Sequence, residues 1–436
     1  MDITIIPQEL SGTIEAISSK SVAHRLLISA AFCTHTTDID CVCTSEDIDA
    51  TKNALCSLGA QITKTQKGFR VLPVPHDLEN TGKFKPIQNS EIDCAESGST
   101  LRFILPCVAA LGCNAKITVG KSLENRPITS LYNELICAGV NLSEEGVWPL
   151  EVSGQLRPGH FLLPGNISSQ YITGLLLAAP LMDGDTYIQV LHPYESRAYV
   201  DLTISAMAEF GVEVISTDVL RDDQNTTVYI VKKDQTYKTC RQVSCEGDWS
   251  NAAFWLGAGA ISNNKVSVLG LDMKSLQADR AYLGALSVMG VKVRRKPDQV
   301  STETSKLRST TICCKDFPDL VPPIAAVAAY INGTTILTGL SRLQYKESNR
   351  IETVVETLRA MGVIARASED KIIINGTGKV FGGVVDSHND HRIAMMASIM
   401  ATKAEGPTTI LGAQCTAKSY PGFYDDFRKL GGKLDS

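Results

Sequence analysis

Acidic and basic side chains alternate in one short segment, Lys346-Glu347-Ser348-Asn349-Arg350, where they could support acid–base chemistry. A carboxylate held among cations can exchange a proton when burial keeps its pKa near neutrality. The same cations can bind a phosphate or carboxylate of a small molecule. Asp319 is a second candidate, because it stands directly before a long apolar run. These residue types predict an anion-binding site with one or two acid–base groups.

Simpler interpretations of the same residues stay open at this level. Lys346 and Arg350 are four positions apart and could lie on the solvated face of a helix, although like charges at this spacing repel each other. Asp319 could be an ordinary helix N-cap. Glu347 could be a first-turn acid that is stabilised by the helix dipole. Under each alternative the residue has a structural role and binds no ligand.

Six polar clusters, each followed by an apolar run, indicate where further binding groups lie. The runs are apolar on nearly every face, as in residues 174–179, which is typical of a buried helix. The N-terminus of such a helix attracts anions, because its first N–H groups lack partners and its dipole is positive. Four basic residues in or just behind the clusters strengthen this prediction: Lys20, Arg25, Arg102 and Arg392. The clusters are Lys20-Ser21, Glu96-Ser97-Gly98-Ser99, Ser168-Ser169-Gln170, Asp248-Trp249-Ser250, Phe317-Pro318-Asp319 and Asn389-Asp390-His391-Arg392.

A helix–glycine–strand phrase follows each cluster by about forty residues and indicates internal repetition. In each phrase an amphipathic helix ends, Gly takes the left-handed conformation, and a strand begins. The glycines are Gly59, Gly139, Gly211, Gly290, Gly362 and Gly431, at steps of 80, 72, 79, 72 and 69 residues. The pattern predicts six units, each with one buried helix, one covering helix and strands between them.

Length and charge limit the class of protein. A chain of 436 residues exceeds the usual size of one core, so the six units predict two domains of three units each. The net charge of −5 argues against a general nucleic-acid binder, which would usually be basic. The start resembles no secretory signal, and no apolar stretch is long enough to span a membrane. The polar stretch 217–243 is expected to close the third unit, with a crossover between domains near residues 240–246.

Cysteine usage and motif searches argue against a metal or an organic cofactor. Thirteen cysteines at irregular intervals predict reduced thiols in a reducing compartment. The close pairs, Cys41-Val42-Cys43 and Cys313-Cys314, lack a second half with zinc-site spacing. The sequence contains neither a phosphate-binding loop of the Walker type nor a dinucleotide fingerprint. We therefore expect no metal site and no cofactor.

Seven separated motifs resemble those of the 5-enolpyruvylshikimate-3-phosphate synthase family, in the family's order and over almost the whole chain. They are Lys20-Ser21-Val22-Ala23-His24-Arg25, Gly98-Ser99-Thr100-Leu101-Arg102, Arg126-Pro127-Ile128, Ser168-Ser169-Gln170, Lys346-Glu347-Ser348-Asn349-Arg350, Asn389-Asp390-His391-Arg392 and Ala417-Lys418. The resemblance implies an α/β fold, the two-domain inside-out α/β barrel of the enolpyruvyl transferases, with six βαβαββ-type units. The implied domains are residues 1–19 plus 246–436 and residues 20–245, with the active site in the cleft between them.

The family transfers the enolpyruvyl (1-carboxyvinyl) group of phosphoenolpyruvate to the 5-hydroxyl of 3-phosphoshikimate and releases phosphate. The resemblance therefore implies this step of the shikimate pathway to chorismate and the aromatic amino acids. It implies two small-molecule substrates, no cofactor, no nucleic acid and no membrane, and a cytoplasmic monomer. By motif, phosphoshikimate would be bound by Lys20, Ser21, Arg25, Ser168, Ser169, Gln170, Ser196, Tyr199, Asp319 and Lys346. Phosphoenolpyruvate would be bound by Lys20, Gly98, Arg126, Gln170, Arg350, Arg392 and Lys418.

The implied catalytic residues are Asp319, Glu347 and Lys20. The reaction needs a proton on the vinyl methylene carbon, loss of a proton from the attacking hydroxyl, and then the reverse elimination. Asp319 and Glu347 match the family's acid and base positions, and either carboxylate could serve either transfer. His391 could be proposed as an acid, but its place at a helix start favours a structural role.

Three residues depart from the family's pattern. Glu96 and Arg342 stand where the family usually has Asn, which leaves the phosphoshikimate contacts at both positions open. Phe103 stands where some members have Pro. Sensitivity to glyphosate is therefore also open, although Gly98 keeps the space that an Ala methyl would fill.

Two other functions compete with this one. UDP-N-acetylglucosamine enolpyruvyl transferase shares the fold, but it uses a loop Cys five residues before the Arg-Pro pair, where this chain has Lys121. A non-catalytic anion-binding or nucleic-acid-processing protein could be built from similar repeats. The net acidity and the placement of Asp319 and Glu347 among cations argue against that second alternative.

Overall fold

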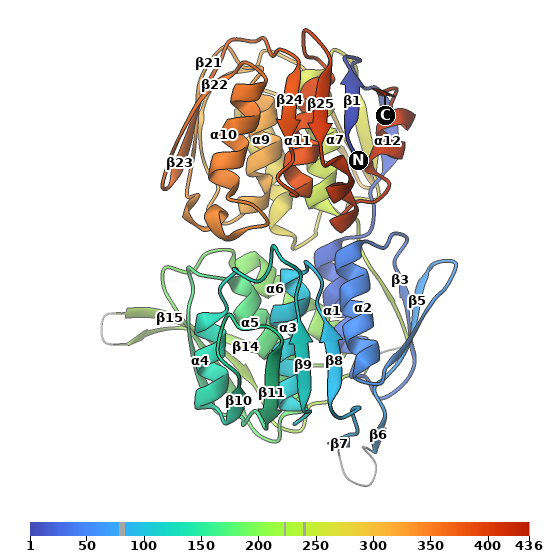
Figure 1. Cartoon of the computed structure of the whole chain (residues 1–436), viewed down its shortest axis with the longest axis vertical. Helices are drawn as coiled ribbons and strands as arrows, with labels where there is room; N and C mark the ends of the chain where they lie inside the picture. The colour runs from blue at the N-terminus through green and yellow to red at the C-terminus, as the bar shows by residue number, and fades with distance from the viewer. Residues whose placement is uncertain (78–82, 222–223, 239–240, 436) are drawn as a thin grey trace. The chain divides into compact units, whose positions relative to one another are not determined.

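The computed structural model describes residues 1–77, 83–221, 224–238 and 241–435 of a mixed α/β chain (Figure 1). The chain forms two compact units. Unit 1 contains residues 1–19 and 246–436, and unit 2 contains residues 20–245. The chain therefore passes between the units twice, after Ser19 and after Cys245. None of the helices in the described residues is long and apolar enough to cross a membrane.

Unit 2 contributes three of the four-stranded sheets. Its helices are α1 (Lys20–Ala31), α2 (Glu46–Ser57), α3 (Gly98–Ala110), α4 (Thr129–Cys137), α5 (Ser169–Ala178), the 3-10 turn η1 (Ala179–Leu181) and α6 (Arg197–Glu209). The first sheet has the order β16 (Gln242–Ser244), β3 (Thr37–Asp40), β5 (Gly68–Leu72), β4 (Gln61–Lys64). The second has the order β8 (Ser90–Asp93), β9 (Ala115–Thr118), β11 (Leu150–Gly154), β10 (Val140–Leu142). The third has the order β12 (His160–Pro164), β13 (Thr186–Leu191), β15 (Gln224–Val231), β14 (Ile215–Arg221), and β6 (His76–Asp77) pairs with β7 (Lys83–Phe84).

Unit 1 contributes the other three. Its helices are α7 (Trp249–Ile261), α8 (Tyr282–Val288), α9 (Val321–Ala328), α10 (Arg350–Ala360), α11 (His391–Ala401) and α12 (Phe423–Lys429). Its 3-10 turns are η2 (Ala278–Ala281), η3 (Pro318–Leu320), η4 (Ser341–Tyr345) and η5 (Ala413–Lys418). One sheet has the order β2 (Gly12–Glu15), β17 (Val266–Leu269), β19 (Gln299–Glu303), β18 (Lys292–Lys296). The others are β20 (Thr311–Cys313), β21 (Gly333–Thr338), β23 (Lys371–Gly376), β22 (Ile364–Ser368) and β24 (Gly383–Asp386), β25 (Thr408–Leu411), β1 (Ile3–Ile6), β26 (Lys433–Asp435).

All six of these sheets share one topology, which confirms the predicted repeat. In the sheet of β20 to β23, β20 runs parallel to β21, and β23 lies antiparallel to both β21 and β22. The same pattern recurs in the sheets that begin with β2, β8, β12, β16 and β24. Each of the six predicted glycines has a positive φ, between +72° and +107°, just past a covering helix.

Three sheets are completed by strands from distant parts of the sequence. Strand β1 pairs with β25 and β26, and β2 pairs with β17. Strand β16 pairs with β3, with Gln242 opposite Asp38. The expectation that all of residues 217–243 close the third unit is therefore wrong in part: β14 and β15 do so, whereas β16 joins the first sheet of unit 2. Residues 222–223 and 239–240 of this stretch lie outside the described residues.

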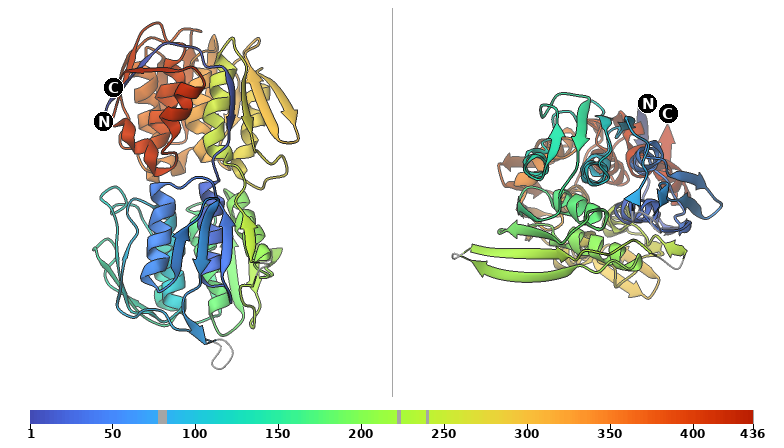
Figure 2. Two further views of the ribbon diagram at one scale, coloured as in Figure 1. Left: turned by 90° about the vertical axis from the view of Figure 1, so that its right-hand side faces the viewer. Right: turned by 90° about the horizontal axis from the view of Figure 1, so that it is seen from below.

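The apolar helices form the interior of each unit, and the sheets and covering helices surround them (Figure 2). In unit 1, α7, α9 and α11 contact one another, and every residue of the three helices is buried. In unit 2, α5 contacts both α1 and α3. This inside-out arrangement explains why the predicted runs are apolar all round.

Candidate active site

Arg350, the first residue of α10, is the centre of a charged cluster in unit 1. Its side chain is only 1% exposed. Nη1 donates to Asp319 Oδ1 at 2.7 Å, and Nη2 donates to Glu347 Oε2 at 2.5 Å. Nε donates to Asp390 Oδ2 at 2.7 Å. The planar fork of a guanidinium suits three carboxylates at once. The alternative that Lys346 and Arg350 lie on a solvated helix face is therefore wrong.

Asp319 lies between three cations. Besides Arg350, it pairs with Lys346 Nζ at 3.2 Å and with Arg392 Nη2 at 3.4 Å. Burial by itself would raise the pKa of Asp319, but the charges of Arg392, Lys346 and Arg350 hold it well below its ordinary value. Asp319 is therefore ionised at neutral pH. An anion that binds these cations would weaken their effect and raise the pKa again.

Helix ends in unit 1 differ from two of the predictions. Asp319 lies in η3, and the N-cap residue of α9 is Leu320, so the interpretation of Asp319 as a plain N-cap is wrong. The first turn of α9 contains two prolines, which have no N–H group to cap. Glu347 lies ahead of α10, not in its first turn, because that helix begins only at Arg350.

Asp390 is a buried carboxylate that the sequence indicated only as part of a motif. It is fully buried and caps α11, where it accepts from the backbone N–H of Arg392 at 2.9 Å. It also accepts from Ser348 Oγ at 3.0 Å and twice from Arg350. His391 is buried as the first residue of α11. Asp390 thus holds the side chain of Arg350 and the backbone of Arg392, and an Asp at the start of a predicted buried helix was the signal that could have indicated it.

Two further charged residues of unit 1 are buried, Lys418 and Asp279. Lys418, 5% exposed at the end of η5, donates through Nζ to the carbonyl of Asn389 at 2.9 Å. Asp279 in η2 is buried and accepts from Ser250 Oγ at the start of α7. Burial, then the charge of Asp319, raises the pKa of Asp279. The two carboxyls therefore have pKa values moved in opposite directions, and only Asp319 was predicted.

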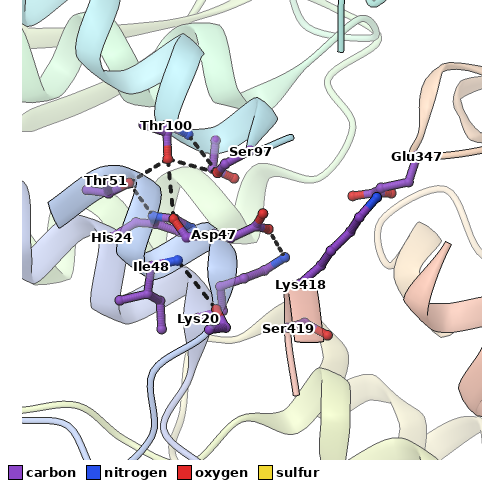
Figure 3. Close-up of polar contacts among 12 residues, drawn as sticks. Lys20, His24, Asp47, Ile48, Thr51, Ser97, Thr100, Glu347, Lys418 and Ser419 are labelled. Atoms are coloured by element: carbon purple, nitrogen blue, oxygen red, sulfur yellow. Dashed lines mark hydrogen bonds and ion pairs between the residues drawn. The ribbon is translucent and has the colours of Figure 1, made fainter. Parts of the chain in front are cut away.

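In unit 2 the N-terminus of α1 holds three predicted residues. Lys20 Nζ pairs with Asp47 Oδ2 at 2.6 Å (Figure 3). Arg25 is 3% exposed and donates to Ser21 O at 2.5 Å and to Tyr199 O at 3.0 Å. These two bonds connect the start of α1 to α6. Ser196, which precedes α6, is buried and has a φ of +54°.

Gly98 allows two guanidinium groups to lie against the backbone at the start of α3. A Cβ at this position would lie 2.9 Å from Arg102 Nη1 and 3.0 Å from Arg126 Nη1. Arg102 Nη1 donates to Gln170 Oε1 at 2.7 Å, and Gln170 Nε2 donates to Ser99 Oγ at 2.9 Å. Arg102 was not among the predicted ligands, yet it joins Gly98 to Gln170. It was detectable only as a cation behind a helix N-terminus.

The remaining predicted residues lie at helix starts. Ser168 caps α5, where its Oγ accepts from Gln170 N at 3.2 Å, and Ser169 is the first residue of that helix. Arg126 lies on the loop before α4, and its Nε is buried with no hydrogen-bond partner among the described residues. The helix itself begins at Thr129, three residues after Arg126.

A chain of hydroxyl groups connects three helices of unit 2. His24 Nδ1 lies 2.7 Å from Thr51 Oγ1, which lies 2.6 Å from Thr100 Oγ1 (Figure 3). Thr100 donates in turn to Ser97 Oγ at 2.8 Å, at the N-cap of α3. Burial, then the charge of Lys20, lowers the pKa of His24, which keeps this imidazole neutral. The chain fixes the starts of α1 and α3 relative to each other.

The three residues that depart from the family's pattern, Glu96, Arg342 and Phe103, each contact a neighbouring residue. Glu96 Oε1 accepts from Ser122 N at 3.4 Å, and Arg342 Nη2 donates to Lys315 O at 2.5 Å. Phe103 is buried beneath the guanidinium of Arg25, which lies 5.2 Å from its ring centre. Lys121 is exposed at the position where the competing transferase uses a Cys. Among the described residues, no group of three His, Cys, Asp or Glu side chains could hold a metal ion.

The six sheets and the buried helices define an α/β protein with the inside-out arrangement of the enolpyruvyl transferases. A family model described as EPSP synthase (3-phosphoshikimate 1-carboxyvinyltransferase) matches residues 5–427. The chain belongs to this family.

Similar proteins agree with this assignment. A protein of Clostridium novyi (strain NT) named 3-phosphoshikimate 1-carboxyvinyltransferase is 38% identical over 436 residues, which cover 100% of this chain and 98% of the relative. A protein of Clostridium kluyveri with the same name is also 38% identical and covers 99% of this chain and 98% of its own length. The structure of EPSP synthase from Acinetobacter baumannii has a TM-score of 0.80 at 24% identity and covers both chains fully, which shows the fold.

Proposed function

We propose that the protein transfers the enolpyruvyl group of phosphoenolpyruvate to the 5-hydroxyl of 3-phosphoshikimate, giving 5-enolpyruvylshikimate 3-phosphate and phosphate. The observation that carries this proposal is the cluster around Arg350, where two partly exposed carboxylates, Asp319 and Glu347, share one buried guanidinium. Such a cluster combines anion binding with acid–base groups, which this reaction needs together. The family and the names of the relatives support the same activity.

The proposed phosphoshikimate ligands are those of the family's motifs. In unit 2 they are helix-start groups on or near α1, α5 and α6: Lys20, Ser21, Arg25, Ser168, Ser169, Gln170, Ser196 and Tyr199. In unit 1 they are Asp319 and Lys346. Hydroxyl groups and N–H groups at a helix start favour a phosphate. Arg25 already donates to Ser21 and Tyr199, so it also orders its neighbours.

The proposed phosphoenolpyruvate ligands are mainly cations. Arg126, Arg350 and Arg392 provide planar forks for a carboxylate or phosphate, and Lys20 and Lys418 provide point charges. Gly98 and Gln170 complete the set. Nε of Arg126 has no hydrogen-bond partner in the part of the chain that the structure describes, which supports its place here, because a buried guanidinium N–H is costly until it has an acceptor.

The proposed mechanism uses Asp319 and Glu347 to move protons, with Lys20 as a third catalytic group. The 5-hydroxyl oxygen attacks C2 of phosphoenolpyruvate, losing its proton to one carboxylate, while C3 gains a proton from an acid. The tetrahedral adduct then loses phosphate and a proton from C3, which restores the double bond. Anionic substrates at Arg350 and Arg392 would offset the charges that hold the pKa of Asp319 low, and so make it a better base.

The proposal also covers the competing reaction, the location and oligomeric state of the protein, and its domains. The exposed Lys121 gives no thiol for the competing UDP-N-acetylglucosamine reaction. We also propose that the protein is a cytoplasmic monomer. The cysteines support a reducing compartment, because the twelve that the structure describes are free thiols. We propose that the two compact units are the two domains of the family.

Calorimetry with 3-phosphoshikimate alone, and then with glyphosate added, tests the substrate assignment. We expect phosphoshikimate to bind by itself and glyphosate to enhance that binding. UDP-N-acetylglucosamine should give no heat of binding. Binding of the nucleotide sugar without binding of phosphoshikimate would overturn the proposal.

A further inference from the structure

The two connections between the units are paired with each other on the unit 1 side. Ser19 N donates to Glu246 O at 2.8 Å, and Asp248 N donates to Ile17 O at 2.8 Å. Ser18 and Gly247 form an antiparallel bridge between these bonds. Residues 17–19 and residues 246–248 therefore form one short antiparallel ladder within unit 1.

The chain passes from one unit to the other between Ser19 and Lys20, and again between Cys245 and Glu246. After Ser19 comes Lys20, which begins α1 and pairs with Asp47 of unit 2. Before Glu246 comes Cys245, whose N–H donates to Asp40 O of unit 2 at 2.8 Å. Hydrogen bonds therefore hold both sides of each step, and little chain is left between them.

Gln277 fixes this ladder to the body of unit 1. Its side chain is 5% exposed, and Oε1 accepts from Ser19 Oγ at 3.1 Å and from Trp249 N at 3.0 Å. Nε2 donates to Glu246 Oε1 at 2.9 Å and to Gly247 O at 2.7 Å. One amide thus makes four hydrogen bonds, which uses all its donor and acceptor capacity. Two of the bonded residues, Ser19 and Glu246, are the last and first residues of unit 1 at the two connections.

We propose that Gln277 is a positioning residue for the transfer reaction, which fixes both connections and so sets the backbone position from which Lys20 begins. It touches no substrate and acts through Ser19. The inference rests on the proposed function, because Lys20 is there assigned to both substrates. The four hydrogen bonds of Gln277 resist backbone rotation in the segments that they hold. Any rotation between the units should therefore occur at the peptide links from residue 19 to 20 and from residue 245 to 246.

The test compares Gln277→Met with a matched control, Thr302→Val. Methionine keeps the length of glutamine but makes none of the four hydrogen bonds. Thr302 is fully buried in β19 and donates to Leu256 O at 2.7 Å, so its loss weakens unit 1 away from the connections. Ser19→Ala, alone and combined with Gln277→Met, isolates the bond that leads to Lys20. Amide hydrogen exchange and steady-state kinetics are measured for each variant.

We expect Gln277→Met to speed exchange at the amides of Ser19, Asp248 and Trp249 by about tenfold or more, with the rest of unit 1 protected. We also expect kcat/KM to fall about 10- to 100-fold for both substrates, because a small misplacement of Lys20 would slow the transfer strongly. Thr302→Val should leave kcat and both KM values near wild type. The effect of Ser19→Ala should be smaller and should not add to that of Gln277→Met.

Equal losses of activity in Gln277→Met and Thr302→Val, or exchange that rises evenly over unit 1, would overturn the inference and leave Gln277 a purely structural residue. Unchanged exchange at the three amides would overturn it as well. The failure of the proposed function would look different. In that case the wild-type protein would show no transfer, while the exchange measurement would still decide whether Gln277 fixes the connections.

Discussion

Asp319 and Glu347 both bind Arg350, so a substrate anion that takes hydrogen bonds from Arg350 affects both carboxylates at once. The ionised form of Asp319 is stabilised by the cations, and burial opposes this effect. The same residues therefore couple anion binding to proton transfer. This coupling explains why the charges are concentrated at the start of α10 and not spread over the surface.

Asp319→Asn and Glu347→Gln should each lower turnover by about two to four orders of magnitude, the usual range for lost general acid–base catalysis. Both changes keep the size of the side chain but remove its ionisable oxygen. Substrate affinity should change much less, by about tenfold for Asp319→Asn. Lys20→Ala should instead weaken both binding and turnover. Steady-state kinetics measures the loss of turnover, and calorimetry measures the loss of binding. Near-normal turnover with lost binding in the carboxylate variants would contradict the catalytic assignment.

Asp279 should make unit 1 less stable as the pH rises. Because its pKa is raised in the folded protein, its favourable contribution is fully present below the ordinary carboxyl value of about 4 and is lost as the pH rises through the folded value. Asn cannot ionise, so the free energy of unfolding of Asp279→Asn relative to wild type should increase with pH. Urea unfolding at several pH values from 4 to 8 measures this difference. A constant difference would show that Asp279 does not titrate as the structure indicates.

The residue types of the site were predictable from the sequence, and some of the supporting residues were not. Lys346, Glu347 and Arg350 stand together in one motif, and the structure gathers them around Asp319. Arg102 was indicated only as a cation behind a helix N-terminus and was assigned to neither substrate, and Asp279 was not predicted at all. Their partners Gln170 and Ser250 come from other helices. Contacts of this kind depend on tertiary packing, which a local pattern does not contain.

Covering helices end in the same way six times, at a glycine with positive φ. This repeated helix end allowed the architecture to be predicted, because the left-handed conformation restricts the residue type. The partners of β1, β2 and β16 were not predictable in this way. Each pairs with a strand far away in the sequence, and no local spacing indicates which strand that is.

Gly290→Ala should destabilise unit 1 more than Gly431→Ala. Both glycines have positive φ, which costs an alanine about 1–2 kcal/mol. A Cβ at Gly290 would also lie 2.6 Å from the backbone oxygen of Lys306, whereas no atom lies within 4 Å of a Cβ at Gly431. We expect a further cost of about 1–3 kcal/mol for Gly290→Ala from this overlap. Urea unfolding measures both, and equal losses would contradict the overlap.

Across the whole molecule, the division into two units and the proposed function predict a change of shape on substrate binding. Positive helix ends repel each other until an anion lies between them, so the ligands should favour closure. The radius of gyration measured by small-angle scattering should decrease with phosphoshikimate plus glyphosate. A scattering curve that does not change with both ligands bound would contradict closure.

The transfer reaction itself tests the central claim most directly. The protein is incubated with phosphoenolpyruvate and 3-phosphoshikimate in EDTA, and the product is identified by mass spectrometry while released phosphate is measured. We predict one 5-enolpyruvylshikimate 3-phosphate for each phosphate, with undiminished activity in EDTA and no product from UDP-N-acetylglucosamine. Transfer to the nucleotide sugar, or no transfer to phosphoshikimate by folded protein, would contradict the account, and activity restored only by a divalent ion would contradict its metal-free chemistry.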